Sequence, residues 1–118
     1  VLQQGVQCAV AREKFQTLTE QMFYILLCLR EERCGVDVME AVSRLTGGLV
    51  AIGPGTLYTL LEDFLREGWI RELPAQGRKR RYRLTPAGEA RLRQEAERLR
   101  RLCGDFDAVM GQSEEKTP

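Results

Sequence analysis

A helix that is bracketed by glycines, and followed at once by a change of hydrophobic period, constrains the fold of this chain most. The segment GPGTLYTLLEDFLREG, residues 53–68, places Gly53 as an N-cap, Pro54 at the first helical position and Gly68 as a left-handed stop. The spacing predicts an inward apolar face made of Leu57, Leu60, Leu61, Phe64 and Leu65. The outward face then holds Gly55, Thr56, Thr59, Asp63 and Arg66. We therefore predict an amphipathic helix over this stretch.

Beyond Gly68 the pattern repeats every two residues, which is typical of strands. Residues 69–73 and 80–84 are predicted to form two short strands joined through residues 74–77. One face of this hairpin would carry Tyr82 and Leu84, and the other Arg81 and Arg83. Trp69 is expected to pack in the core beneath the hairpin.

Two further helices are predicted upstream. Thr17, with Glu20 three residues later, fits a capping box for the first, which is expected to end near Arg33. Its apolar residues recur at helical spacing at Leu18, Met22, Ile25, Leu26 and Leu29. The second helix covers residues 36–45 and stops at Gly47 or Gly48. Its apolar face is expected to hold Val38, Met39, Val42 and Leu45.

This order of elements predicts the fold class. A short helix, a second helix at residues 53–68 and a hairpin directly behind it form a winged helix-turn-helix. We therefore predict a mainly α protein with one small β-hairpin, in which residues 17–85 form the winged helix-turn-helix domain.

A long last helix is predicted to begin behind Thr85 as N-cap, with Pro86 at its first position. Its apolar residues form a heptad seam at Leu92, Ala96, Leu99, Cys103, Phe106 and Met110. A single helix with such a seam needs a partner, so residues 86–110 are predicted to form a dimerisation helix against a second copy. A dedicated drug pocket is the alternative, for which Phe106 is the only aromatic residue on this helix.

The remaining segments exclude several classes of protein. Residues 1–16 are expected to form an arm or a further helix, and the polar residues 111–118 a disordered tail. The longest apolar run, residues 22–29, is far shorter than the roughly 20 residues that cross a bilayer. The N-terminus also lacks the charged and apolar regions of a signal peptide. We therefore expect a cytoplasmic protein without membrane contact.

The residue types argue against an enzyme or a metalloprotein. The chain has no histidine, no GxSxG motif and no P-loop lysine. Its four cysteines form no CxxC pair, so reduced thiols are expected, with Cys28 in the core. A redox or metal pair of Cys34 and Cys103 is the minor alternative. We expect no catalytic residue, no metal and no cofactor.

Positive charge is concentrated in one block. The formal net charge is only +1, yet residues 71–101 hold 11 Lys and Arg against 4 Asp and Glu. Five of these cations fall in one six-residue stretch of the predicted hairpin, residues 78–83: Arg78, Lys79, Arg80, Arg81 and Arg83. A block of this kind favours a polyanionic partner. With Arg78 and Lys79 at the tip of a wing, it could reach DNA phosphates or a minor groove.

The start of the 53–68 helix offers the complementary contacts to double-stranded DNA. Its backbone N–H groups and dipole favour phosphate, Gly55 permits close approach, and three residues carry hydroxyls. We predict DNA contacts by Gly55, Thr56, Tyr58, Thr59, Arg78, Lys79, Arg80 and Arg81. Base discrimination is expected to be modest, because Thr and Tyr read bases less well than Arg or Asn.

Glu62 and Asp63 lie in the middle of this helix, where negative charge should hinder DNA binding. The N-terminal residues of a recognition helix meet the bases, whereas Asp63 lies roughly 13 Å beyond Pro54 along the axis. The pair could therefore clear the phosphates, or could lower nonspecific binding by repelling them. The rival hypothesis is a winged helix that binds a protein partner and no DNA.

Four motifs in order resemble the PadR family of bacterial transcriptional regulators. They are the PGTLY helix, the EGWI exit, the GRKR wing and the LTPAG lead into the last helix. The resemblance covers about residues 17–103, and a single helix after the wing is similar to the short branch of the family. It implies a homodimeric repressor that binds a roughly palindromic operator and is released by a small-molecule effector. Two departures stand out: residues 34–37 replace the usual Y-G-Y-E, and Glu62 and Asp63 replace a basic pair.

Overall fold

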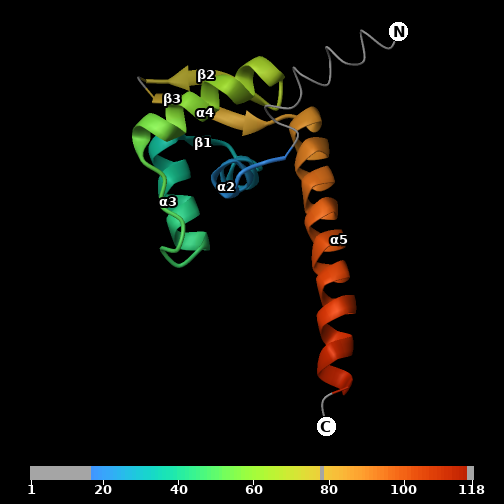
Figure 1. Ribbon diagram of the computed structural model, residues 1–118. Coiled ribbons are helices and arrows are strands. Elements are labelled where there is room, and N and C mark those ends of the chain that lie inside the picture. The colour runs from blue at the N-terminus through green and yellow to red at the C-terminus, as the bar shows by residue number, and fades with distance from the viewer. Residues whose placement is uncertain (1–16, 78, 117–118) are drawn as a thin grey trace, which may run out of the picture.

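The computed structural model describes residues 17–77 and 79–116 (Figure 1). The head of the molecule contains α2 (Glu20–Cys28), α3 (Gly35–Leu45), α4 (Pro54–Glu67) and the strands β1 (Arg33–Cys34), β2 (Ile70–Gln76) and β3 (Lys79–Leu84). The last helix, α5 (Pro86–Lys116), begins beside the sheet and leaves the head as one long rod. The predicted winged helix is confirmed. The expected arm at residues 1–16 lies outside the described residues.

The first helix, α2, begins and ends differently from the prediction. Its N-cap is Thr19, whose hydroxyl accepts a hydrogen bond from the Met22 N–H at 3.1 Å, while the Thr19 N–H donates to the Met22 sulfur at 3.4 Å. The prediction of Thr17 as the cap is wrong, because Thr19 still has an extended backbone, with φ of −69° and ψ of 164°, so the helix begins at Glu20. The Leu18 N–H donates to the Glu95 carboxylate at 3.2 Å. The helix ends at Cys28, well before Arg33.

Arg33 and Cys34 leave the helical path because they join the sheet. They form β1 and pair antiparallel with Tyr82 and Arg81 of β3, so the strand order is β1-β3-β2. The Arg33 Nε donates to the Cys28 carbonyl at 2.8 Å, which satisfies one open acceptor at the end of α2. A strand of two residues has no hydrophobic period, so the sequence alone did not predict it.

The hairpin is longer than predicted. Residues 74–76, expected as the loop, belong to β2, and an irregularity between Leu73 and Gln76 lets Gln76 pair with Lys79. The turn is made at Gly77, whose φ of 77° suits a residue without a side chain. Pro74 is tolerated because β2 is an edge strand.

The two helices of the helix-turn-helix are close to the prediction. α4 has Gly53 as N-cap, Pro54 at its start and Gly68 as a left-handed C-cap with φ of 76°, as expected. α3 ends as predicted, but Leu45 on its last turn is 56% exposed rather than buried. The loop behind it contributes Val50 and Ile52 to the core instead.

The head and the start of α5 meet in a tight contact. Thr85 caps α5 as predicted, since its hydroxyl accepts from the Gly88 N–H at 3.0 Å. A Cβ on Gly88 would lie 2.0 Å from the Trp69 carbonyl oxygen, so only glycine fits between the helix and the sheet. Leu92, one turn later, is 8% exposed and belongs to the core of the head.

Glu95 follows as a buried carboxylate that the residue pattern did not reveal. It is 2% exposed and accepts from the Leu18 N–H, from Arg98 at 2.5 and 3.2 Å, and from Arg91 at 3.5 Å. These donors, Arg98 first, hold the pKa of Glu95 below its ordinary value. We name Glu95, Arg91, Arg98 and the Leu18 N–H the root cluster, because they fasten α5 to the start of α2.

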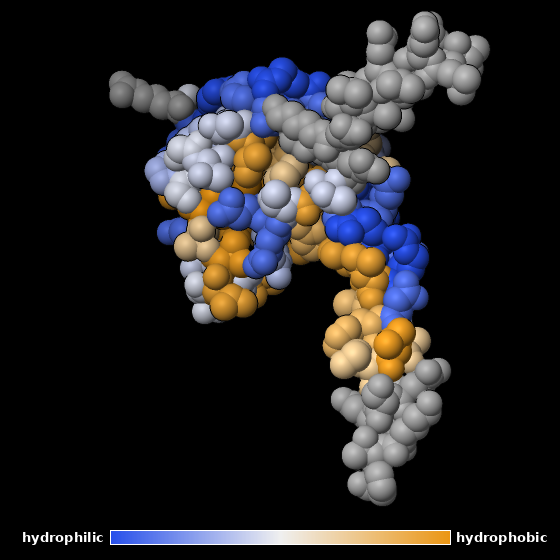
Figure 2. Space-filling view, viewed as in Figure 1, coloured by the Kyte–Doolittle hydropathy of each residue, from blue (hydrophilic) through white to orange (hydrophobic). Residues whose placement is uncertain are grey.

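The distal part of α5, from Leu99 onward, contacts little of the head. Its large apolar side chains are exposed: Leu99, Leu102, Phe106, Val109 and Met110. Figure 2 shows orange and tan atoms on the lower part of the rod. The helix continues to Lys116, so the predicted boundary at residue 110 is too early. Gln, Glu and Lys residues favour a helix even in a polar segment.

Among residues 17–77 and 79–116, every helix is too short or too polar to span a bilayer.

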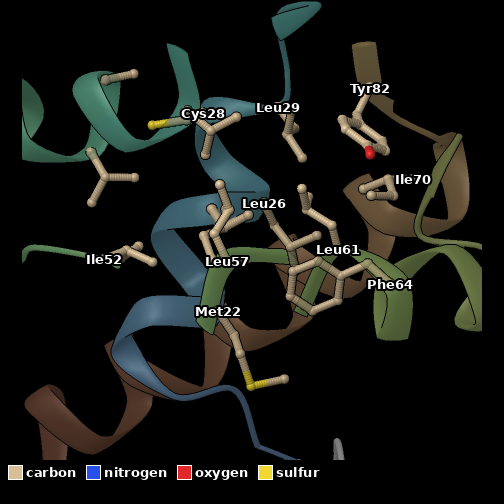
Figure 3. Close-up of a cluster of buried hydrophobic side chains, with 14 of the residues drawn as sticks. Met22, Leu26, Cys28, Leu29, Ile52, Leu57, Leu61, Phe64, Ile70 and Tyr82 are labelled. Carbon is tan, nitrogen blue, oxygen red and sulfur yellow. The ribbon is translucent and has the colours of Figure 1, made fainter. Parts of the chain in front are cut away.

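The core of the head is built where α2, α3, α4 and the sheet converge. Figure 3 shows Leu26, Leu57, Leu61 and Phe64 turned toward one another, with Ile70 and Tyr82 of the sheet beside them. Cys28 is buried here as predicted, and burial raises the pKa of its thiol. Trp69 is half-buried against Phe64, with ring centres 5.8 Å apart. The core thereby fixes the directions of α4 and the hairpin.

Candidate nucleic-acid interface

The first turn of α4 lies open to solvent. Gly55, Thr56 and Thr59 are exposed, and Gly53 caps the helix without a side-chain hydrogen bond. The early N–H groups of the helix therefore point outward without a capping oxygen, which is a suitable arrangement for phosphate.

The Tyr58 ring lies against the start of α3. Tyr58 is 43% exposed, and a Cβ built on Gly35 would lie 2.5 Å from its hydroxyl. Any side chain at position 35 would therefore displace the Tyr58 ring from this position. The sequence alone assigned Gly35 no role, since a contact between two helices is not visible in the spacing of either.

The wing residues predicted to bind DNA have different environments. Lys79 is exposed at the first position of β3 beside the turn. Arg78 lies outside the described residues. Arg80 and Arg81, in contrast, are both engaged by carboxylates of this chain.

Arg80 makes the most extensive of these contacts. Its Nη2 and Nε donate to the two carboxylate oxygens of Glu72 on β2 at 2.7 and 3.0 Å. The same Nη2 lies 3.6 Å from the carboxylate of Glu62 on α4. We name Glu62, Glu72 and Arg80 the wing cluster. The hydrogen bond from Arg80 holds the pKa of Glu72 below its ordinary value, and Glu72 raises the pKa of Arg80.

Arg81 points to the other side of the hairpin, where its Nε lies 2.9 Å from the carboxylate of Glu32. Arg83, also on β3, is exposed and directly opposite Arg71 of β2. Like charges placed directly opposite destabilise a strand pair, so an anion over this face would relieve repulsion. Arg93 of α5 lines the same hollow of about 530 Å³. The sequence alone did not single out Arg71, because only the register of the strands shows that the two arginines meet.

Glu62 and Asp63, neighbours on α4, have different environments. Glu62 is half-exposed and turned toward the wing, whereas Asp63 is 8% exposed and bound to Arg66. The expectation that Asp63 points outward is therefore wrong. Three positions after Leu60 and one before Phe64, it lies at the border of the apolar face, where Arg66 reaches over it.

The hydroxyl of Tyr82 is a buried polar group beside the wing cluster. The Tyr82 hydroxyl has no hydrogen-bond partner among the described groups, and the residue is 1% exposed. The guanidinium of Arg80 lies 5.6 Å from the centre of its ring. Burial raises the pKa of Tyr82.

The residues predicted for the dimer interface fall into two groups. Leu92 lies in the core of its own chain, and Ala96 lines a groove of about 470 Å³ between α2 and α5. The apolar floor of this groove comprises Phe23, Leu27, Leu84, Leu92 and Ala96. The others are exposed on the distal rod: Leu99, Cys103, Phe106 and Met110. Cys34 is buried and Cys103 exposed, both as free thiols, which is against the pair considered above.

Comparison with known proteins gives a consistent family. Residues 25–94 match the model of the transcriptional regulator PadR-like family. A protein encoded in transposon Tn4556 of Streptomyces fradiae is 36% identical over 70 residues, which are 59% of this chain and 20% of that protein. The chain thus spans about a fifth of this curated relative.

Solved structures share the fold. A PadR family regulator from Eggerthella lenta has a TM-score of 0.65 at 21% identity, covering 92% of this chain and 90% of its own. A regulator from Clostridium thermocellum has a TM-score of 0.64 at 22% identity, covering 77% and 89%. Bacillus subtilis PadR, solved in complex with operator DNA, has a TM-score of 0.56 at 26% identity, covering 64% of this chain and 45% of that chain.

Proposed function

The chain belongs to the transcriptional regulator PadR-like family, and from this premise we propose that it is a sequence-specific DNA-binding regulator that acts as a homodimeric repressor. The observation that carries the proposal is the open first turn of α4, which lies on the same side of the head as the hairpin (Figure 1). A recognition helix and a wing in this arrangement would contact a major groove and the adjacent backbone or minor groove.

The contacts proposed for the recognition helix are those of its first turn. The N–H groups around Gly55 and the hydroxyls of Thr56, Tyr58 and Thr59 would meet phosphates and base edges. Tyr58, whose hydroxyl lies next to Gly35 at the start of α3, would offer its exposed side to DNA. Lys79, beside the turn of the wing, would supply a phosphate contact, with Arg78 next to it.

The dimer is proposed to form through α5. An exposed row of five large apolar side chains on the distal rod is unfavourable in water and fits a second copy. The groove between α2 and α5 would receive the partner's rod, because its lining combines apolar side chains with three arginines and two glutamates: Arg30, Arg93, Arg100, Glu89 and Glu97. A small effector, as the family resemblance implies, would release DNA by changing the angle between the two rods.

Binding to genomic fragments tests the function directly. Purified protein should enrich a small set of duplex fragments, and the enriched sites should show two half-sites related by symmetry. Thr56→Ala with Thr59→Ala should lower affinity for an enriched fragment about tenfold or more, since a specific contact to a base edge is worth on the order of 1–3 kcal/mol. Arg101→Ala, an exposed cation on the rod, is the matched control and should leave binding unchanged.

Two outcomes would reject the proposal. Absence of salt-dependent binding to any duplex, together with capture of a protein partner by α4, would favour a protein-interaction module. A persistent monomer in sedimentation experiments would reject the homodimer, whereas Phe106→Asp with Leu102→Asp should convert a dimer into a monomer that binds DNA weakly.

A further inference from the structure

The wing cluster carries an inference that rests on the proposed function and goes beyond it. We infer that Glu62 and Glu72 are specificity-determining residues, which occupy Arg80 and so prevent this one arginine from binding phosphate regardless of the DNA sequence. On a matching site, the docked duplex would present a phosphate to Arg80 in place of the carboxylates.

The geometry of Arg80 is the first step. Glu72 takes both a terminal and the inner nitrogen of the guanidinium at 2.7 and 3.0 Å, which is the bidentate geometry that phosphate would also use. Glu62, from the recognition helix, approaches the same terminal nitrogen at 3.6 Å. Arg80 therefore faces two carboxylates of its own chain where a wing cation would otherwise face DNA.

Exposure of the cluster is the second step. The side chains of Arg80, Glu62 and Glu72 are 50%, 52% and 38% exposed. Ion pairs with this much water contact contribute little to folding, so the cluster is not required as a structural lock. For the same reason a well-placed phosphate can displace the carboxylates, whereas a loosely bound duplex cannot.

Placement between two DNA-reading elements is the third step. Glu62 belongs to α4 and Arg80 to β3, so their contact joins the recognition helix to the wing. Repulsion by the pair of Glu62 and Asp63 acting together does not fit this arrangement, because Asp63 is buried and bound to Arg66. The role falls to Glu62 and to Glu72, which the sequence alone did not connect with it.

The experiment compares Glu62→Gln and Glu72→Gln with the wild-type chain. Glu31→Gln is the matched control, since Glu31 is an exposed carboxylate paired with an arginine, Arg33 at 3.2 Å, outside α4, the hairpin and α5. Affinity is measured by fluorescence anisotropy across a range of salt concentrations. The probes are a random-sequence duplex and a fragment enriched from genomic DNA.

Both cluster variants should bind the random duplex about three- to tenfold more tightly, with a salt slope steeper by about one unit, because Arg80 gains a phosphate contact. Affinity for the enriched fragment should rise less, so the ratio between the two should fall. Variants that match Glu31→Gln in both affinity and slope would overturn the inference.

Two further outcomes separate the possible causes. In an Arg80→Gln background the gain from Glu62→Gln should vanish; a gain that persists would assign the effect to direct repulsion of DNA and overturn the role of Arg80. If wild-type protein binds no duplex, the proposed function itself fails and this inference with it. Thermal melts of each variant confirm that the fold is kept.

Discussion

The root cluster and the wing cluster contain the same residue types but differ in burial and therefore in role. Both are glutamates held by arginines, yet Glu95 is 2% exposed and has donors from α5 and from the start of α2, whereas the three wing residues are about half-exposed. Burial makes the first cluster a structural requirement, because an unpaired buried charge is costly. Exposure makes the second cluster exchangeable, because water and salt screen it.

The largest effect is expected from breaking the root cluster. Glu95→Ala should lower the free energy of unfolding by about 3 kcal/mol, since Arg91, Arg98 and the Leu18 N–H would all be left without this acceptor at a buried site. Urea unfolding at fixed protein concentration measures it. Glu31→Ala, which removes an exposed carboxylate that also pairs with an arginine, should have no measurable effect. A decrease below about 1 kcal/mol for Glu95→Ala would remove the contrast between the clusters.

Acid should weaken the root cluster in a defined direction. The pKa of Glu95 is lowered by its donors from the ordinary 4.5, so its stabilisation is complete above pH 4.5 and is lost as the pH falls through the lowered value. Unfolding experiments on wild type and Glu95→Gln should therefore differ by a constant amount from neutral pH down to about that point. Below it the two curves should converge. Curves that stay parallel into strong acid would contradict the assignment.

A smaller change in stability is expected at Tyr82, whose buried hydroxyl lies near the wing cluster without a described hydrogen-bond partner. Tyr82→Phe should leave stability unchanged or raise it by up to about 1 kcal/mol, because the hydroxyl is buried without a described partner. Urea unfolding again provides the measurement. A clear decrease in stability would show that the hydroxyl has a hydrogen-bond partner in solution. Tyr82 would then be, like Glu95, a buried polar group whose hydrogen bonds stabilise the fold.

The smallest effect on stability is expected at Glu72. Glu72→Gln should not shift the melting temperature measurably, because its ion pair with Arg80 lies at the surface. Calorimetric melts in low and high salt give the comparison. A drop in melting temperature that disappears in high salt would mean that the wing cluster stabilises the fold after all, and would blur its distinction from the root cluster.

Much of the fold followed from local signals. Gly53, Pro54 and Gly68 bound α4 where the sequence indicated, because capping and backbone conformation depend on residues that are neighbours in the chain. β1 was missed because a two-residue strand exists only through its partner β3. The hydrogen bond from the Leu18 N–H to Glu95, 77 residues away, was missed for a related reason.

The proposed site divides in the same way. The basic block and the open turn of α4 were apparent from residue types, and these remain the proposed contacts with DNA. The residue types did not show that carboxylates of the same chain pair with Arg80 and Arg81. Nor did they show that Arg71 lies opposite Arg83. Counting charges along the chain treats every arginine alike, whereas its availability depends on which carboxylate lies across the fold.

The sequence by itself determined the order of elements, the ends of the recognition helix, the basic wing and the apolar rod, because periodicity, capping and composition act over a few residues. Only the tertiary structure decided which charges are buried, which are paired and which face solvent. Those properties depend on distances in space between segments that are far apart in the chain, because the energy between two charges falls as the distance between them grows.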